Sequence, residues 1–500
     1  MSGSEVRSSV RRGVACLLFA VAVSGCAGAV ATPTGTPPGT STLAPWTPAA
    51  TSSPTPTPVP TPTPTATPTA APTAAPPTPA PSADVPDWLK GDFDVLMGRD
   101  TGLTAAQDGG QLAGSEVDDF GFDLLRRVES GSANLCVSPT SIALALAMVR
   151  AGANGQTAAE MDKVLRGLGS PQEAGQVLAL VQALRSRAIY VDDNGVPIVD
   201  ETPGPTATPA VDLNLVNAAF VQKGMPVEES YLDALRTEFG AGAGVLDFQA
   251  DPEAARVTIN KWADVQTRGR IPNPLNPGDV TSATRIALAN ALYFKASWAS
   301  QFDPTKTSGR GFTTAAGGSK TVATMAQTIR TTYGAGKDYR AVSLPYAGGF
   351  QMLIVVPTSM TSFVTSLSAT RLSGIWSAMQ PYDVNLTLPR FSIDNRIELG
   401  SILSAMGMPT VFSASADLSG ITGAERLFLD RVVHQANIDV VEDGTTAAAV
   451  TIALGSTTGG QPVTPPKTTF HVDHPFLYFI EDMSSQAVLF EGVVNDPSAK

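Results

Sequence analysis

Cysteine, histidine and charged side chains are all scarce in this chain of 500 residues. It contains three cysteines, three histidines and 16% charged residues. Cys16 and Cys26 lie near the N-terminus, so only Cys136 remains in the body and no intrachain disulfide is available there. The body must therefore be stabilised by burial of its hydrophobic residues, which make up 43% of the chain. The net charge of −12 argues against nucleic acid and polyanionic cofactors as ligands, because both require a basic face.

The apolar run at residues 14–23 is too short for a stable membrane-spanning helix. Arginines precede it, an arrangement typical of an export signal. The run leads into Val23-Ser24-Gly25-Cys26, which resembles the bacterial lipobox, where the cysteine thiol receives a diacylglycerol. We therefore expect residues 1–25 to be a lipoprotein signal peptide and Cys26 to anchor the chain in a membrane. An ordinary signal peptide followed by an incidental cysteine is the alternative.

Residues 26–83 are predicted to form a tether. Between residues 31 and 83 the chain consists mainly of Thr, Pro, Ala and Ser and carries no charged side chain. Such a segment cannot bury enough apolar surface to fold, and its prolines favour extended conformations. Globular sequence begins near Asp84, so residues 84–500 are predicted to be one large domain on a stalk.

Motifs of common enzymes are absent from the sequence. There is no Gly-x-Ser-x-Gly elbow and no His-Glu-x-x-His pair, so a cell-surface hydrolase is disfavoured and the chain is predicted not to be an enzyme. His471 and His474 flank Asp473 but lack a third strong ligand nearby, so no metal site is predicted. No cofactor is predicted either.

The order of the predicted elements favours an α+β domain with large antiparallel sheets. A helix is expected to start at Ser115, and a short strand at residues 134–137 should lead through Pro139 into an apolar helix. Helical spacing recurs at residues 254–268 and 396–406. Apolar runs typical of strands occupy residues 213–221, 285–294, 342–346, 351–356, 384–388 and 476–480.

The segment from Glu442 to Thr458 contains only small or β-branched, uncharged residues between Gly444 and Ala453. Small polar side chains allow an exposed loop, whereas Thr445, Ala447, Ala449 and Thr451 alternate as a strand requires. These residues by themselves fit either a loop or a strand that slides between two others.

Several blocks of sequence together resemble the serpin family, and they stand in the family's order from Ser115 to the C-terminus. They include Leu288-Ala289-Asn290-Ala291-Leu292-Tyr293-Phe294, Leu388-Pro389-Arg390-Phe391 and Glu442-Asp443-Gly444-Thr445. The remaining blocks are at residues 138–142, 259–262, 267–271, 344–346, 406–408, 434–436 and 470–476.

The resemblance implies an α+β serpin fold with three β-sheets, eight to nine helices and an exposed reactive loop. A serpin of this kind inhibits a protease by suicide: the loop is cleaved, stays acyl-linked to the protease and inserts into the main sheet. The hinge of that loop corresponds to Glu442, Gly444, Thr445, Ala447, Ala448, Ala449 and Thr451. The region where the main sheet opens corresponds to Ser138, Ser141, Asn290 and His434.

Counting from Gly444 as in the family places the scissile bond between Thr458 and Gly459, although cleavage anywhere from 454 to 464 fits the length of the loop. No Lys or Arg occurs between Asp443 and Pro466, which favours an elastase-like or subtilisin-like target over a trypsin-like one. We expect an exported monomer, lipid-anchored at the cell surface, with the target protease as its partner. A non-inhibitory serpin that acts as a surface binding protein or chaperone is the alternative.

Overall fold

Long, almost continuously apolar strands build the centre of the molecule. The computed structural model describes residues 14–23, 85–91, 93–184, 187–189, 210–445 and 464–499; at 14–23, 88 and 187–189 it describes the backbone alone. Two long strands of the main sheet, β5 (Val211–Gln222) and β7 (Ile286–Ser297), are almost fully buried. Burial on both faces explains why their sequences lack the alternation of a half-exposed strand.

Within the described ranges, the main sheet contains nine strands. Seven follow one another in the order β13 (Phe391–Glu398), β14 (Leu429–Val440), β1 (Val14–Val23), β7, β5, β6 (Ala243–Leu246) and β2 (Asp94–Leu96). The short β15 (Gly444–Thr445) pairs with β7, and β4 (Arg187–Ile189) pairs with β5. β1, which contains the apolar run predicted to be the core of an export signal, lies between β14 and β7 and is antiparallel to both.

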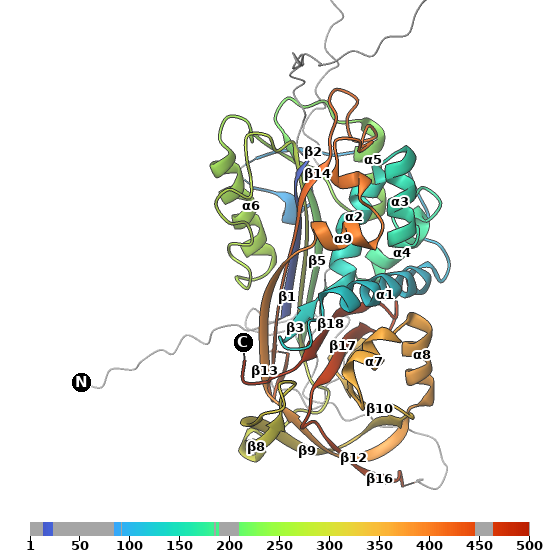
Figure 1. Cartoon of the computed structure of the whole chain (residues 1–500). Helices are drawn as coiled ribbons and strands as arrows, with labels where there is room; N and C mark the ends of the chain where they lie inside the picture. Colours follow the sequence, from blue (N-terminus) through green and yellow to red (C-terminus); the bar gives the residue numbers. More distant parts are fainter. Residues whose placement is uncertain are drawn as a thin grey trace, which may run out of the picture. The chain divides into compact units, whose positions relative to one another are not determined.

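The other nine strands form a second hydrogen-bonded ladder, in which the long β9 (Ser319–Ala335) joins two sheets. At one end of the molecule, β8 (Ser308–Thr313), β12 (Gln380–Pro389) and β16 (Lys467–His471) lie with β9 (Figure 1). The remaining strands run from β9 toward helix α1, in the order β10 (Tyr339–Pro345), β11 (Phe350–Pro357), β17 (Phe476–Asp482), β18 (Val488–Val494) and β3 (Leu135–Val137). With the main sheet these make the three sheets that the sequence predicted.

Nine α-helices lie in the described ranges. They are α1 (Gly109–Val128), α2 (Pro139–Ala151), α3 (Gly155–Leu165), α4 (Ala174–Ala183), α5 (Glu229–Phe239), α6 (Pro252–Gln266), α7 (Met360–Thr365), α8 (Ala369–Ala378) and α9 (Gly400–Met406). Short 3-10 turns occur at η1 (Asp87–Leu89), η2 (Pro304–Lys306), η3 (Ala347–Gly349) and η4 (Thr410–Phe412). Among these helices none combines the length and the apolarity needed to cross a membrane. The predicted α+β class with eight to nine helices is confirmed.

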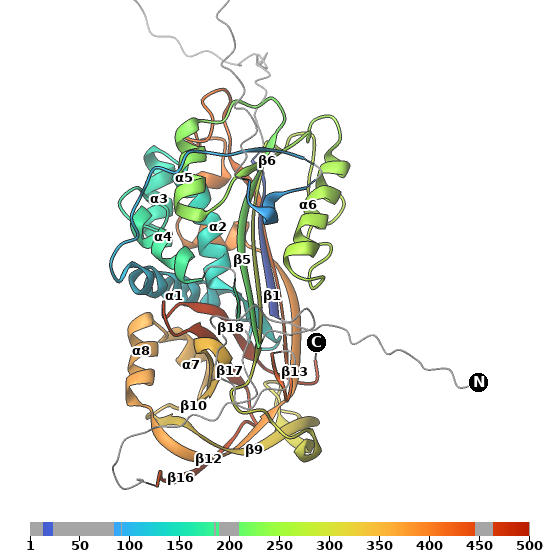
Figure 2. The same ribbon diagram turned by 180° about the vertical axis from the view of Figure 1, so that it is seen from behind.

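Helices cover both faces of the main sheet. Figures 1 and 2 show α6 on one face and α2 on the other, with α3, α4 and α5 beyond α2. Leu288, Leu292 and Phe294 of β7 belong to the core that includes α2, whereas Ala289 and Ala291 belong to the core that includes Trp262 of α6. Along β7, even-numbered side chains therefore face the core with α2, and odd-numbered side chains face the core with α6.

Two local predictions from the sequence are wrong. The first helix begins at Gly109 rather than Ser115, so Ser115 lies within the helix and caps nothing. The segment 396–406 is not helical throughout, because β13 continues to Glu398, paired with β14, and α9 begins only at Gly400. In both places tertiary contacts override the local signal.

Candidate functional site

A tight turn at the end of β14 sends the chain back alongside β7. Val441 and Gly444 exchange two backbone hydrogen bonds, with N···O distances of 3.1 and 3.2 Å. Gly444 has φ +132°, and a Cβ atom there would lie 2.3 Å from the carbonyl oxygen of Ala296. A residue without a side chain is therefore required at this turn, for conformation and for space. The turn lies at the first residues of the predicted hinge.

Thr445 is already a strand residue. With Gly444 it forms β15, in which Gly444 pairs with Ser297 and Thr445 with Ala296 of β7. Its side chain is fully buried, and its Oγ1 lies 2.6 Å from the hydroxyl of Tyr346. Tyr346 in turn stacks on Trp298, with ring centroids 4.2 Å apart. The start of the predicted hinge is thus held on β7 by packing as well as by backbone pairing.

Glu442 anchors the turn by a charge pair. Its carboxylate accepts a hydrogen bond of 2.8 Å from Arg390 Nε and another from the hydroxyl of Thr307. Burial raises the pKa of this carboxyl, but the hydrogen bonds from Arg390 and Thr307 outweigh burial and hold the pKa below its ordinary value. Glu442 is therefore ionised near neutral pH and fixes the chain just before the turn.

The predicted sheet-opening residues form a buried polar network around the N-terminus of α2. Ser138 caps that helix by accepting a hydrogen bond from the backbone N–H of Ser141, and its own N–H donates to Nε2 of His434 at 3.1 Å. The hydroxyl of Ser141 donates to Asn290 Oδ1 at 2.6 Å, and Asn290 Nδ2 donates to Asn217 Oδ1 at 2.6 Å. The structure therefore brings together all four residues predicted for this region.

His434 is neutral in this network. Burial lowers its pKa to about 3, because a buried imidazolium would lose its hydration. An uncharged ring is also what the geometry requires, since Nε2 accepts the hydrogen bond from Ser138. The network consequently links β14, through α2, to β7 and β5 by hydrogen bonds.

Comparison with known proteins identifies the family. The family model described as Serpin (serine protease inhibitor) matches residues 115–497. The chain belongs to the serpin family. It is similar to Iripin-8 of Ixodes ricinus, with 34% identity over 82% of this chain and 98% of that one. It is also similar to the leukocyte elastase inhibitor of Xenopus tropicalis, with 32% identity over 77% of this chain and 99% of the other.

Solved serpin structures share the fold. Native protease nexin-1, solved with heparin, is 28% identical and has a TM-score of 0.64 over 78% of this chain and all of that one. A cleaved ovalbumin mutant with its loop inserted is 27% identical and has a TM-score of 0.64 over 77% of this chain and all of that one. The description of the family, serine protease inhibitor, is consistent with the prediction that the chain is not an enzyme.

Several predicted site residues of this serpin lie outside the described residues. They are the hinge residues Ala447, Ala448, Ala449 and Thr451, the scissile pair Thr458 and Gly459, and the lipid attachment residue Cys26. The predicted tether at 26–83 lies outside as well, and so does the proline-rich stretch between β4 and β5 up to residue 209.

Other residues of the site were not predicted as such. Asn217 completes the polar network, and Arg390, Thr307 and Tyr346 hold the turn. One signal for Asn217 exists in the sequence, because it is one of two asparagines within the apolar run at 213–221. Arg390 and Tyr346 lie within blocks that resemble the family, but nothing in those blocks indicates their partners.

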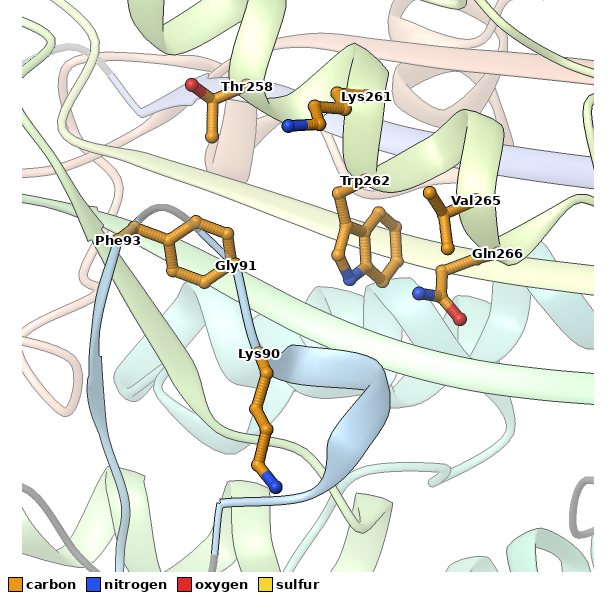
Figure 3. Close-up of a pocket in the computed structure, with 8 residues that line it drawn as sticks. All are labelled: Lys90, Gly91, Phe93, Thr258, Lys261, Trp262, Val265 and Gln266. Carbon is orange, nitrogen blue, oxygen red and sulfur yellow. The ribbon is translucent and has the colours of Figure 1, made fainter.

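The body of the serpin offers a shallow pocket at the outer edge of α6. Its volume is about 240 Å³, and Figure 3 shows Phe93 and Trp262 beside it. Lys90 points away from the rings in this view and pairs with Asp87 at 2.5 Å. The pocket lies where the segment before β2 meets α6. Across the described ranges, no group of three or more His, Cys, Asp or Glu residues is arranged to hold a metal ion.

Proposed function

We propose that this serpin is a suicide-substrate inhibitor of an elastase-like or subtilisin-like serine protease. The observation that carries the proposal is the direction of β15. It enters the space between β14 and β7, which we call the lane, and runs antiparallel to β7. It therefore points along the path that an inserting loop must follow. That lane also admits a complete strand, since β1 lies in it and pairs with both neighbours.

The covalent chemistry belongs to the protease. Its serine Oγ attacks the carbonyl carbon of the scissile bond, the C–N bond breaks, and the new amine takes the proton that the protease histidine removed from the serine. The loop is then held as an ester on the protease. Insertion of the loop into the main sheet must outpace attack by water on this ester, so the composition of the hinge decides between inhibition and turnover.

The register of β15 supports rapid insertion. Each residue beyond Thr445 would face the preceding residue of β7, so Ala447 would stand opposite Phe294 and Ala449 opposite Leu292. These positions of β7 pack toward α2 in the core of the molecule. Small side chains at the alternate hinge positions can enter such a core without clashes. Thr451 would then stand opposite Asn290, where its hydroxyl could join the polar network.

The target class follows from residues outside the described part of the loop. Between Asp443 and Pro466 the chain offers no Lys or Arg, so a protease that requires a basic residue before the scissile bond has no site there. A small or apolar specificity pocket fits this segment better. The similarity to leukocyte elastase inhibitors agrees with this class.

The proposal is tested with the chain that starts at Cys26, incubated with elastase-like, subtilisin-like and trypsin-like proteases. We expect an adduct with the first two classes that survives denaturing gels, and a released C-terminal peptide whose mass identifies the scissile bond. The matched control is Ala449→Arg, which puts a charge opposite Leu292. It should be cleaved at the same bond without an adduct. Cleavage of both proteins without any adduct would favour the non-inhibitory alternative.

We also propose that the mature serpin is attached to the cell surface through a lipid on Cys26. Support comes from the lipobox-like residues and from the long uncharged segment that follows them. The variant Cys26→Ala should be released from the membrane fraction, whereas the unaltered chain should require detergent for its extraction. Equal release of both would leave an ordinary export signal as the explanation.

A further inference from the structure

The strand β1 occupies the lane that the reactive loop is proposed to enter. On one side it pairs with β7 from Val14 opposite Phe294 to Val21 opposite Ala287. On the other side it pairs with β14 from Ala15 opposite Asn437 to Val23 opposite Leu429. In the described part of the sheet, β7 and β14 are joined only through this strand.

The hinge and β1 also agree in their direction and register along β7. Both are antiparallel to β7, so they run in the same direction, and β15 ends at Thr445 opposite Ala296. The next strand residue in the lane is Val14, opposite Phe294, which leaves one position of β7 between them. Continued in register, the loop would place Ala447 where Val14 now stands. An inserted loop and β1 therefore exclude each other sterically.

The two segments are also alike in composition. In the shared register, residues 447–454 read Ala-Ala-Ala-Val-Thr-Ile-Ala-Leu, and residues 14–21 read Val-Ala-Cys-Leu-Leu-Phe-Ala-Val. Both are uncharged, lack proline and glycine, and carry alanine at the second and seventh positions. Such segments suit a strand buried on both faces. The central difference is at the fifth position, where Leu18 stands opposite Asn290 in place of the hydroxyl-bearing Thr451.

We propose that residues 14–23 of the precursor serve as a temporary substitute for the reactive loop. While this segment fills the lane, the loop cannot insert, so a protease would cleave the precursor as an ordinary substrate. Removal of the signal peptide would empty the lane and make the serpin inhibitory. This inference rests on the proposed function for its consequence, but the occupation of the lane can be tested by itself.

Occupation is tested by a cross-link to a cysteine that the segment already contains. Cys16 stands opposite Ala436 of β14 in the register. Directly opposed residues of antiparallel strands have Cα atoms about 4.5–5.5 Å apart, within the range that a disulfide spans. We therefore expect Ala436→Cys, in the full chain with Cys26→Ala, to form a Cys16 disulfide on mild oxidation. Peptide mass spectrometry would detect it.

The matched control is Val432→Cys, which stands opposite Ala20, four residues from Cys16. Four strand residues span about 13 Å, too far for a disulfide. Linkage of Ala436→Cys but not of Val432→Cys would support the register. Equal linkage of both variants, or linkage of neither, would overturn the proposal whatever the inhibitory activity.

The consequence for inhibition is tested with four purified chains. The full chain should give about tenfold less adduct than the chain starting at Cys26, because only molecules with an empty lane can insert the loop. Leu18→Pro in the full chain should restore the adduct, since proline removes a ladder hydrogen bond in mid-strand. The control Ala29→Pro, placed after β1, should not. Equal adduct from the full and mature chains would overturn the inference, whereas no adduct from any chain would instead count against the proposed function.

Discussion

Among single residues, Gly444 shows how the backbone fixes the start of the reactive loop. Its φ of +132° lies where residues with a side chain are strained, and the space for a Cβ atom is already taken by the backbone of β7. The neighbouring Glu442 and Thr445 are both buried and hydrogen-bonded. The start of the predicted hinge is therefore fixed in place by these contacts, and any movement during insertion would have to begin after Thr445.

The variant Gly444→Ala should weaken the attachment of the start of the hinge to β7. We expect a loss of about 1–3 kcal/mol in the free energy of unfolding, because the residue must adopt a strained conformation or leave β7. Less adduct and more cleaved product should accompany it on denaturing gels. Gly374→Ala is the matched control, since Gly374 lies in α8 with open space around it and should gain about 0.5–1 kcal/mol. A neutral Gly444→Ala would contradict the assigned geometry.

Among the elements, α2 connects strands that would have to separate for the proposed insertion of the loop. Its N-terminal residues reach β14 through His434 and β7 through Asn290. Each of these bonds lies in the protein interior, where a donor or acceptor left without its partner costs more than in water. Opening the sheet therefore requires that the polar groups exchange partners rather than lose them.

Replacing His434 by phenylalanine tests the link between α2 and β14. The N–H of Ser138 would lose its acceptor, at a cost of about 1–3 kcal/mol in the free energy of unfolding. The pH dependence should change as well. With a pKa of about 3 in the folded state and an ordinary value when unfolded, His434 makes the serpin more stable as the pH rises from about 3 to about 6.5.

Urea unfolding between pH 4 and pH 8 would measure both effects. In His434→Phe the contribution of this residue to the rise below pH 6.5 should disappear. The midpoint should therefore lie below that of the unaltered chain at pH 8, and this difference should shrink toward pH 4. His471→Phe provides the control, because the ring of His471 is exposed at the edge strand β16. An unchanged pH profile in His434→Phe would show that another group carries the dependence.

The elements of the fold were predictable where burial leaves a simple pattern. The apolar runs at 213–221, 285–294 and 351–356 correspond to β5, β7 and β11, because strands covered on both faces are apolar throughout. The start of α1 was not predictable, since Gly109 and Gly110 are poor helix formers and no side chain caps the helix. Pairing with β14, which the local sequence does not reveal, makes residues 391–398 a strand.

The site was predictable as a set of residues but not as a set of contacts. The family resemblance identified Ser138, Ser141, Asn290 and His434, and the structure joins them by hydrogen bonds. Asn217 was missed because an amide in a buried strand carries no information about its partner. The place of residues 14–23 in the sheet was also missed, since the same apolar sequence suits an export signal and a buried strand.

At the scale of the whole molecule, buried carboxyl groups make the stability of the fold decrease as the pH rises. Glu481 and Glu491 are buried, and burial raises the pKa of each to about 8. Glu481 still accepts a hydrogen bond from Trp376, whereas neither carboxyl oxygen of Glu491 has a partner among the described residues. Burial likewise raises the pKa of nearby Asp118. These groups are retained in their neutral form inside the fold.

The sign of the effect follows from proton binding. Between the unfolded pKa of about 4.5 and the folded value near 8, the folded state holds protons that the unfolded state has released. Stability should therefore be greatest at the acid end of this window and fall by about 1.4 kcal/mol per pH unit for each group as the pH rises. The variant Glu491→Gln should flatten the profile between pH 6 and pH 9.

Thermal or urea unfolding at pH 6 and pH 9 would check this prediction, with Glu229→Gln as the control. Glu229 is an exposed residue of α5, so its replacement should leave the profile unchanged. The benefit of Glu491→Gln should be larger at pH 9 than at pH 6. An equal benefit at both pH values would mean that packing, and not ionisation, distinguishes the variant.

The single lane between β7 and β14 has a consequence for how the amount of inhibitor is set. In the proposed scheme two segments of one chain fit this lane, and only one of them would be removed on export. The number of active molecules outside the cell would then equal the number of chains whose export was completed, and not the number of chains synthesised. Proteases inside the cell would encounter only the inactive form, and a stalled precursor would be discarded without having captured any of them.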